Sequence, residues 1–274
     1  MPASLFAYEW AVRLGAFAVV FVAMAWWELR LPRRPLTVGR RPRWSSNLGI
    51  VAIDSVLVRV LFPTAAVGVA LICEARGWGL LPWLGMSYAL ATLLAVIVLD
   101  LAIYLQHALF HHVPMLWRLH RMHHADLDLD VTTGVRFHPI EILLSLLIKF
   151  AVVAAIGAPA LAVLIFEVLL NATSMFNHSN VRMPPAVDAV VRWLVVTPDM
   201  HRVHHSIIRA ETDSNFGFNF PWWDRLFGTY RPQPREGHDA MTIGIDAFRD
   251  PTELRLDRML LQPFRNDGKG VKVG

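Results

Sequence analysis

The sequence predicts an all-α integral membrane protein, in which a four-helix-type transmembrane region carries a cytoplasmic, histidine-rich helical cap. Apolar residues make up 55% of the 274 residues and charged residues only 18%, whereas soluble domains carry about 45–50% and about 25%. The mean hydropathy is +0.42, and the apolar residues form runs long enough to span a bilayer. Eleven of the twelve histidines lie between His107 and His205, directly after and between these runs.

Two apolar regions come first. Residues 5–27 contain Glu9 and Arg13, which can pair on one helix face. A cleaved signal peptide is less favoured, because no basic segment precedes this run. Residues 48–73 contain Asp54 and Arg59, whose charges should face protein rather than lipid. Six arginines lie between the two regions, in residues 28–43, and the positive-inside rule places this loop in the cytoplasm.

The third and fourth apolar regions predict one further span and a broken hairpin. Residues 77–99 are 23 residues without a charge, enough to cross about 30 Å of hydrocarbon. This span would bring the histidines that follow it to the cytoplasmic face. Residues 140–170 are interrupted by Gly157, Ala158 and Pro159. Because histidines lie on both sides of this region, we expect a helical hairpin that turns at the break.

These regions divide the chain into three parts. Residues 1–100 form the N-terminal transmembrane region, residues 101–231 the catalytic domain that includes the hairpin at 140–170, and residues 232–274 a C-terminal cytoplasmic tail. The last ten residues, with Lys269 and Lys272, are expected to be frayed. Cys73 is the only cysteine, which excludes an internal disulfide, a cysteine-ligated iron–sulfur cluster and a multi-cysteine zinc site. The scattered arginines favour lipid head groups over nucleic acid as partners.

Three histidine boxes indicate a metal centre. They are HALFHH at 107–112, HRMHH at 120–124 and HRVHH at 201–205. Residues i, i+3 and i+4 share a helix face, so each box can present two or three imidazoles to one point. A lone histidine on an apolar helix is usually a core residue, and histidine tracts can be compositional. Three separate boxes on one membrane face favour metal binding instead, because so many gathered imidazoles are costly to bury without a metal ion.

The number of histidines favours two metal ions. Eight to ten imidazoles exceed the three or four ligands of a single zinc. Neither the HExxH zinc-protease motif nor the G-x-S-x-G motif of serine hydrolases is present. Two metals in an all-nitrogen environment at a membrane surface favour redox chemistry on a lipid. Iron suits this chemistry, whereas zinc does not change its oxidation state.

The boxes resemble those of the fatty acid hydroxylase/sterol desaturase superfamily of integral membrane oxygenases. Three flanking stretches share the resemblance, namely DVTTGVRFHPIE at 130–141, MFNHSN at 175–180 and SNFGFNFPWWDRLFGTYR at 214–231. Together the matching motifs cover residues 90–231. The resemblance implies a centre of two iron ions, O₂ as co-substrate, and attack on an unactivated C–H bond of a sterol, fatty acyl or isoprenoid lipid. Zinc is a possible substitute for iron.

The resemblance also implies the site residues. His138, in the RFHP element, favours the sterol-desaturase-like branch, and His112 is interpreted as supporting a ligand rather than being one. Four other residues could orient ligating histidines or act only as caps and interfacial charges, namely Asp100, Asp126, Glu141 and Asn177. His238 lies outside every motif and is expected on the surface. The ten implied metal ligands are His107, His111, His120, His123, His124, His138, His178, His201, His204 and His205.

The remaining expectations concern partners and alternatives. The substrate is expected to be a lipid that enters from the bilayer. Because no G-x-G-x-x-G motif and no cysteine cluster is present, a separate reductase, cytochrome or ferredoxin should supply the electrons. The compact chain favours a bacterial inner membrane, with the histidine site on the cytoplasmic side. Hydroxylation, desaturation and ether cleavage are not distinguished. A histidine-rich metal transporter would need ionisable residues along a path through the bilayer, and a zinc-dependent lipid hydrolase would need only three ligands.

Overall fold

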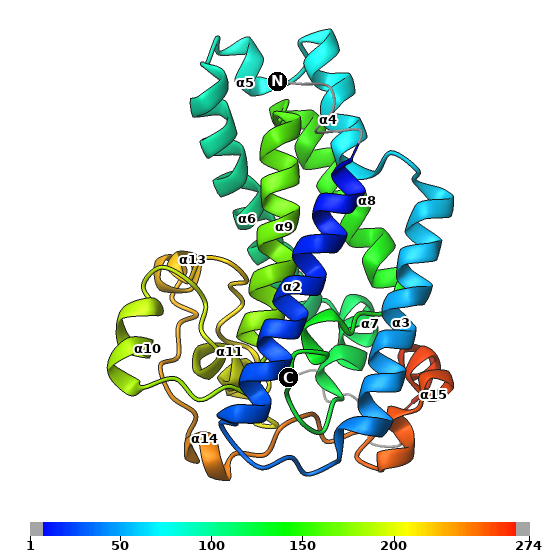
Figure 1. Cartoon of the computed structure of the whole chain (residues 1–274), viewed down its shortest axis with the longest axis vertical. Coiled ribbons are helices and arrows are strands. Elements are labelled where there is room, and N and C mark those ends of the chain that lie inside the picture. The colour runs from blue at the N-terminus through cyan, green and yellow to red at the C-terminus, as the bar shows by residue number, and fades with distance from the viewer. Residues whose placement is uncertain (1–7, 267–274) are drawn as a thin grey trace.

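The computed structural model describes residues 8–266 and arranges them as a helical bundle with a cap at one end (Figure 1). Within this part of the chain there is no strand, and the two backbone bridges are isolated, so the predicted all-α class is confirmed. Five segments are long and apolar enough to cross a membrane. The helices of the bundle are α2 (Glu9–Arg30), α3 (Arg40–Leu61), α4 (Ala65–Arg76), α5 (Leu80–Trp83), α6 (Tyr88–His112), α8 (Pro139–Ile156) and α9 (Ala160–Asn177).

Two helix boundaries differ from those expected. The second apolar region is divided into α3 and α4 around Pro63, which cannot continue a helical hydrogen-bond ladder. The third region does not form a helix from residue 77. Gly77, Gly79 and Gly85 all have positive φ there, so the long helix α6 starts only at Tyr88. It then continues to His112 and includes the first histidine box.

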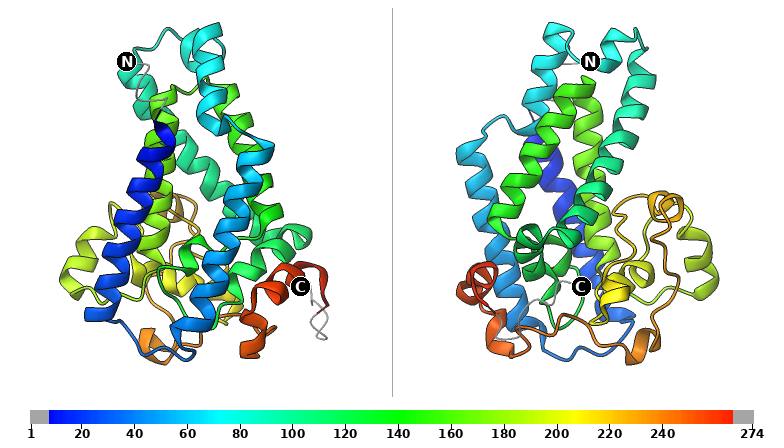
Figure 2. Two further views of the ribbon diagram at one scale, coloured as in Figure 1. Left: turned by 45° about the vertical axis from the view of Figure 1, so that its right-hand side comes forward. Right: turned by 180° about the vertical axis from the view of Figure 1, so that it is seen from behind.

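The expected hairpin is present. Helix α8 ends at Ile156 and α9 begins at Ala160, and Gly157 between them has a φ of 65°. The turn packs closely against the chain before α5, since a Cβ on Gly157 would lie 2.2 Å from the carbonyl oxygen of Trp78. Figure 2 shows the two helices side by side. The hairpin returns the chain to the end of the bundle where α8 began.

The core of the bundle is built from small apolar side chains. Ala66 and Ala70 of α4, Ala95 of α6 and Ala160 and Ala162 of α9 are completely buried. Small residues allow helices in a membrane to approach closely, where lipid provides no hydrophobic drive for association. Large apolar side chains of α2 and α3 instead face outward, as expected for surfaces in contact with lipid.

Short helices form the cap, at the end of the bundle where α2 ends and α3 begins (Figure 2). The described part of the expected C-terminal tail packs onto this end, with α15 against α3 and η3 against α7. Lys269 and Lys272 lie outside the described residues. The elements of the cap are α7 (Pro114–His124), η1 (Thr133–Val135), α10 (Pro185–Val191), α11 (Pro198–His204), α12 (Arg209–Thr212), α13 (Trp222–Leu226), α14 (Gly237–Ala240), η2 (Pro251–Leu254), α15 (Leu256–Leu261) and η3 (Gln262–Phe264).

Candidate metal centre

Four helices bring the histidines together where the bundle meets the cap. His107 and His111 lie one turn apart near the end of α6, and Pro114 starts α7 directly afterwards. Helix α7 carries the second box and α11 most of the third, whereas His178 follows the last residue of α9. The helical spacing of each box therefore sets which imidazoles share a face, and the hairpin α8–α9 returns His178 to the same end.

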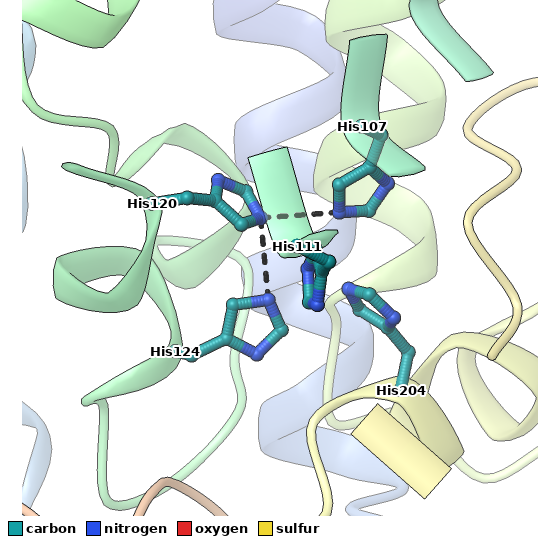
Figure 3. Close-up of side chains that lie close together, drawn as sticks. All are labelled: His107, His111, His120, His124 and His204. Carbon is teal, nitrogen blue, oxygen red and sulfur yellow. Dashed lines mark hydrogen bonds between the residues drawn. The ribbon is translucent and has the colours of Figure 1, made fainter. Parts of the chain in front are cut away.

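Nine of the ten predicted ligands form two groups, and in each group the candidate ligand atoms lie within 4.8 Å of one another. None of these nine side chains is more than 3% exposed. Figure 3 shows the first group, whose imidazoles surround a common space. The first group is His107, His111, His120, His124 and His204, and the second group is His123, His178, His201 and His205.

Backbone carbonyl oxygens hold several of these imidazoles through Nδ1. The Nδ1 of His107 donates to Phe216 (2.7 Å) and that of His204 to Ser214 (2.7 Å). In the second group, His123 donates to Arg136 (3.0 Å), and His178 to Ser174 (2.8 Å). A carbonyl oxygen can only accept, so in each ring Nδ1 carries the proton and Nε2 keeps a free lone pair. This is how proteins orient metal-ligating histidines.

Carboxylates hold two further imidazoles in the same way. The Nδ1 of His120 donates to Oε1 of Glu141 at 2.6 Å, and the Nδ1 of His111 to Oδ1 of Asp213 at 3.3 Å. Glu141 comes from the first turn of α8, so the hairpin also positions a ligand of the first group. Of the four residues predicted to orient histidines, Glu141 is the one whose side chain contacts an imidazole.

The Nε2 atoms face one another at distances that fit a shared metal ion. His107 Nε2 lies 3.1 Å from His120 Nε2, and His123 Nε2 lies 3.1 Å from His178 Nε2. Each of these four rings already carries its proton on Nδ1, so two lone pairs meet without a hydrogen between them. Such a pairing is repulsive unless a metal ion accepts both lone pairs. The residues of both groups therefore fit metal ions of the kind that imidazole prefers.

Burial also keeps several imidazoles of the two groups neutral, the form that binds metals. It lowers the pKa of His123, His124 and His205 well below the ordinary value, and neighbouring histidines lower it further. Burial lowers the pKa of His178 to about 3. His123, His124, His178 and His205 are thus neutral and able to coordinate a metal ion at neutral pH.

The structure does not bring His138 together with the other nine. Its Nδ1 accepts the N–H of Ile140 at the start of α8, and its Nε2 donates to the carbonyl oxygen of Leu260. Both ring nitrogens are thus occupied, and His138 caps a helix. His112 also lies outside both groups, because its Nδ1 donates to the carbonyl of Ala108 and its side chain is exposed.

Three residues predicted to orient histidines have other partners. Asp126 forms ion pairs with Arg43 at 2.7 Å and Arg136 at 3.8 Å. Asp100 accepts from Trp223 Nε1 at 2.8 Å. The side-chain amide of Asn177 donates to the carbonyl of Phe218. These contacts support the cap rather than the imidazoles directly.

His238 is not on the surface, which corrects the expectation for this residue. It is 6% exposed, and its Nε2 lies 3.7 Å from Oδ2 of Asp199 on α11. Burial lowers its pKa to about 4. The sequence gives no indication that His238 is buried, because the segments that cover a histidine outside a motif are distant in the chain.

Sequence reasoning also missed the acceptors that hold the imidazoles. Phe216 and Ser214 act through their backbone oxygens, which every residue type has, so no residue pattern reveals them. The segment containing them, 214–231, was singled out as a motif without a role for individual residues. The sequence places Arg43 in the arginine-rich loop, whereas it belongs to the first turn of α3 and is completely buried.

A cavity of about 510 Å³ extends from the first group into the bundle. His107 and His120 line one end, next to Phe137 and Phe218. Helices α2, α3, α8 and α9 provide most of the remaining wall. Its volume lies in the range of small-molecule sites, roughly 300–1,000 Å³.

Comparisons with known proteins agree with this geometry. The family model described as "Fatty acid hydroxylase" matches residues 92–229. The chain belongs to the fatty acid hydroxylase family. No solved structure matches it significantly. All nine histidines of the two groups lie in the part that matches this family, together with the α8–α9 hairpin.

The relatives of this fatty acid hydroxylase family member are longer proteins. It is 30% identical to an ornithine lipid hydroxylase of Rhizobium tropici, over 68% of this chain and 54% of that protein. It is 28% identical to an alkylglycerol monooxygenase of Xenopus tropicalis, over 59% and 35%. It is 22% identical to a very-long-chain aldehyde decarbonylase of Oryza sativa subsp. indica, over 76% and 32%. The chain thus spans about half or less of these proteins.

Proposed function

We propose that this protein is a membrane-bound di-iron oxygenase that hydroxylates or desaturates a C–H bond of a lipid. The observation that carries the proposal is the pair of buried imidazole groups, one of which opens into a cavity within the membrane-spanning bundle. The ornithine lipid hydroxylase and the alkylglycerol monooxygenase among the relatives support a lipid as substrate. O₂ is the proposed co-substrate.

Each histidine group would hold one iron ion, and the bound irons would supply the activation of O₂. The chain itself orients the ligands through Glu141 and the carbonyl oxygens. Phe137 and Phe218 lie against the imidazoles and exclude water from them. Because His107 and His120 line the cavity, the first group is where the substrate carbon meets the centre. The walls of the cavity select that carbon by holding the rest of the lipid.

The electrons come from a separate reductase, cytochrome or ferredoxin, because the sequence has no cysteine cluster or dinucleotide motif of its own. The arginine-rich connection from α2 to α3 lies at the end of the bundle that carries the cap (Figure 2). Together with the positive-inside rule, this supports a cytoplasmic site in a bacterial inner membrane.

Charged residues inside the bundle do not favour the metal-transporter alternative. Lys149 and Arg13 line the cavity and pair with Glu167 at 2.9 Å and 3.1 Å. Because these two cations and Glu167 neutralise one another, the three side chains do not form a path of free ligands for a metal ion. The cavity is therefore better suited to an organic substrate than to a metal in transit.

Metal content and O₂ reactivity test the proposal. The full chain is purified in detergent without air, loaded with iron, and assayed for bound metal and for O₂ uptake after chemical reduction. We expect about two irons per chain, from two ligand groups, together with O₂ uptake and a lipid product that contains added oxygen or a new double bond. Tightly bound zinc that iron does not replace, without O₂ uptake, would support the zinc hydrolase instead.

A further inference from the structure

Asp54 is a buried carboxyl group without a partner. It lies on α3, is 8% exposed and lines the cavity that reaches the first histidine group. Within residues 8–266, neither of its oxygens accepts a hydrogen bond or forms an ion pair. Other buried carboxylates of the bundle each have at least one partner. Glu28 accepts from the N–H groups of Val131 and Asn180, and Glu167 pairs with Lys149.

A second acid acts on Asp54 across the cavity wall. Glu141, on the neighbouring helix α8, repels the carboxylate of Asp54. Glu141 uses Oε1 to hold His120, and its Oε2 has no hydrogen-bond partner in the described part of the chain. The wall of the cavity beside the histidines therefore contains two carboxyl groups, and each has an oxygen that accepts no hydrogen bond from the described residues.

The cations of the bundle are occupied elsewhere. Arg59, one turn further along α3, is exposed and donates to the carbonyl of Pro63. Arg13 and Lys149 are held by Glu167. Among residues 8–266, Asp54 thus has no cation to balance it, although burying an unpaired carboxylate is strongly unfavourable. A ligand that brings a positive charge and N–H donors would remove this cost.

We propose that the cavity binds a lipid that carries a primary ammonium group, and that Asp54 holds this group beside the first histidine group. The ammonium supplies the charge and the donors that the wall lacks. The carbons next to the amine then face His107 and His120. That the bound lipid is the substrate rests on the proposed function, whereas its binding does not depend on iron or O₂.

Binding of hexadecylamine to the metal-free full chain in detergent tests this inference. Tritiated hexadecylamine is competed with unlabelled hexadecylamine or with hexadecanol, which has the same chain without the charge. We expect the alcohol to compete at least about tenfold more weakly, and Asp54→Asn to weaken amine binding by about tenfold or more, because the charged pair is lost. Asp54→Glu, which keeps the charge, should retain the preference for the amine.

A matched control is Glu9→Gln. Glu9 lines the same cavity but belongs to the first turn of α2, at the end away from the cap. Its replacement should leave amine binding within about twofold, because the ammonium contacts the other end. Asp54→Asn should unfold at the same temperature as the native protein or higher, since it removes an unpaired buried carboxyl group. A folded Asp54→Asn protein with native amine affinity, or equal competition by the alcohol, overturns the inference.

The two proposals fail in distinguishable ways. If amine binding depends on Asp54 but the iron-loaded protein takes up no O₂, the amine site stands and the oxygenase is wrong. If O₂ is consumed and a lipid is oxidised, but Glu9→Gln rather than Asp54→Asn abolishes binding of hexadecylamine, the oxygenase stands and this inference is wrong.

Discussion

At the scale of single residues, the candidate centre depends on which nitrogen of each imidazole carries the proton. Glu141 and the carbonyl oxygens of Phe216, Ser214, Arg136 and Ser174 accept from Nδ1 and direct Nε2 toward the metal positions. Since these acceptors come from α8, α9, the residue after η1 and the loop before α13, the ligands are held by parts of the chain that carry no histidine box.

Replacing Glu141 by alanine should weaken metal binding by about 10–100-fold, the usual effect of removing the acceptor behind a ligating histidine. The ring of His120 would lose its 2.6 Å hydrogen bond and its fixed orientation. Competition with a chelator of known affinity measures the change. Asp257→Ala, at an exposed position of α15, is the control. Unchanged metal affinity in the Glu141 variant would show that His120 does not depend on this contact.

His178→Ala should weaken metal binding at the second group and lower the metal content after dialysis from about two ions toward about one per chain, because it removes one of the four imidazoles of that group. His112→Ala, outside both groups, should leave the metal content unchanged.

His138→Ala should also keep the metal but destabilise the fold by about 0.5–2 kcal/mol, since it removes the cap of α8. Metal analysis and thermal unfolding measure the two effects. Loss of metal from the His138 variant would show that His138 is a metal ligand.

At the scale of elements, the hairpin α8–α9 positions the centre. It brings Glu141 at its start and His178 at its end to the same side of the bundle. The turn is possible because Gly157 adopts a positive φ and lies against Trp78 and Gly79. Glycine is the residue that adopts this conformation without strain.

Gly157→Ala should destabilise the protein by about 1–3 kcal/mol, because the new Cβ meets backbone atoms and the left-handed conformation strains an alanine. Thermal unfolding in detergent, followed by circular dichroism, measures the loss. Gly15→Ala is a matched control in α2, where the added Cβ has no neighbour within 4 Å. Equal unfolding temperatures for the two variants would contradict the tight packing of the turn.

At the scale of the whole molecule, one buried arginine joins the bundle to the cap. Arg43, in the first turns of α3, pairs with Asp126 at 2.7 Å and also with Asp130, and donates to Thr133. These acceptors belong to the segment that follows the second histidine box. The network therefore links the arginine-rich connection to the loop that supports α7.

Arg43→Ala should cost about 3–5 kcal/mol, because it leaves buried Asp130 without its ion-pair partner and buried Asp126 with only the more distant Arg136. Arg41→Ala, two residues earlier and exposed, should have almost no effect. Adding Asp126→Asn to the Arg43 variant should recover part of the stability, since one stranded charge is removed. Chemical denaturation of the three proteins measures these differences, and a mild effect of Arg43→Ala would show that water reaches the aspartates.

Several features followed from the sequence alone. The lengths of the apolar runs predicted the helical class, Gly157 and Pro159 predicted the hairpin, and the spacing of the boxes predicted imidazoles on shared faces. All three are local properties, set by backbone geometry and by residues a few positions apart. Nine of the ten histidines that the motifs indicated are found together for this reason.

Only the tertiary structure decided how these local elements are used. It divided the histidines into two groups, gave His138 a capping contact, paired Asp126 with Arg43, buried His238, and left Asp54 unpaired beside the cavity. Each of these outcomes depends on contacts between segments far apart in the chain. The periodicity of one helix contains no information about which neighbour will accept its protons or balance its charges.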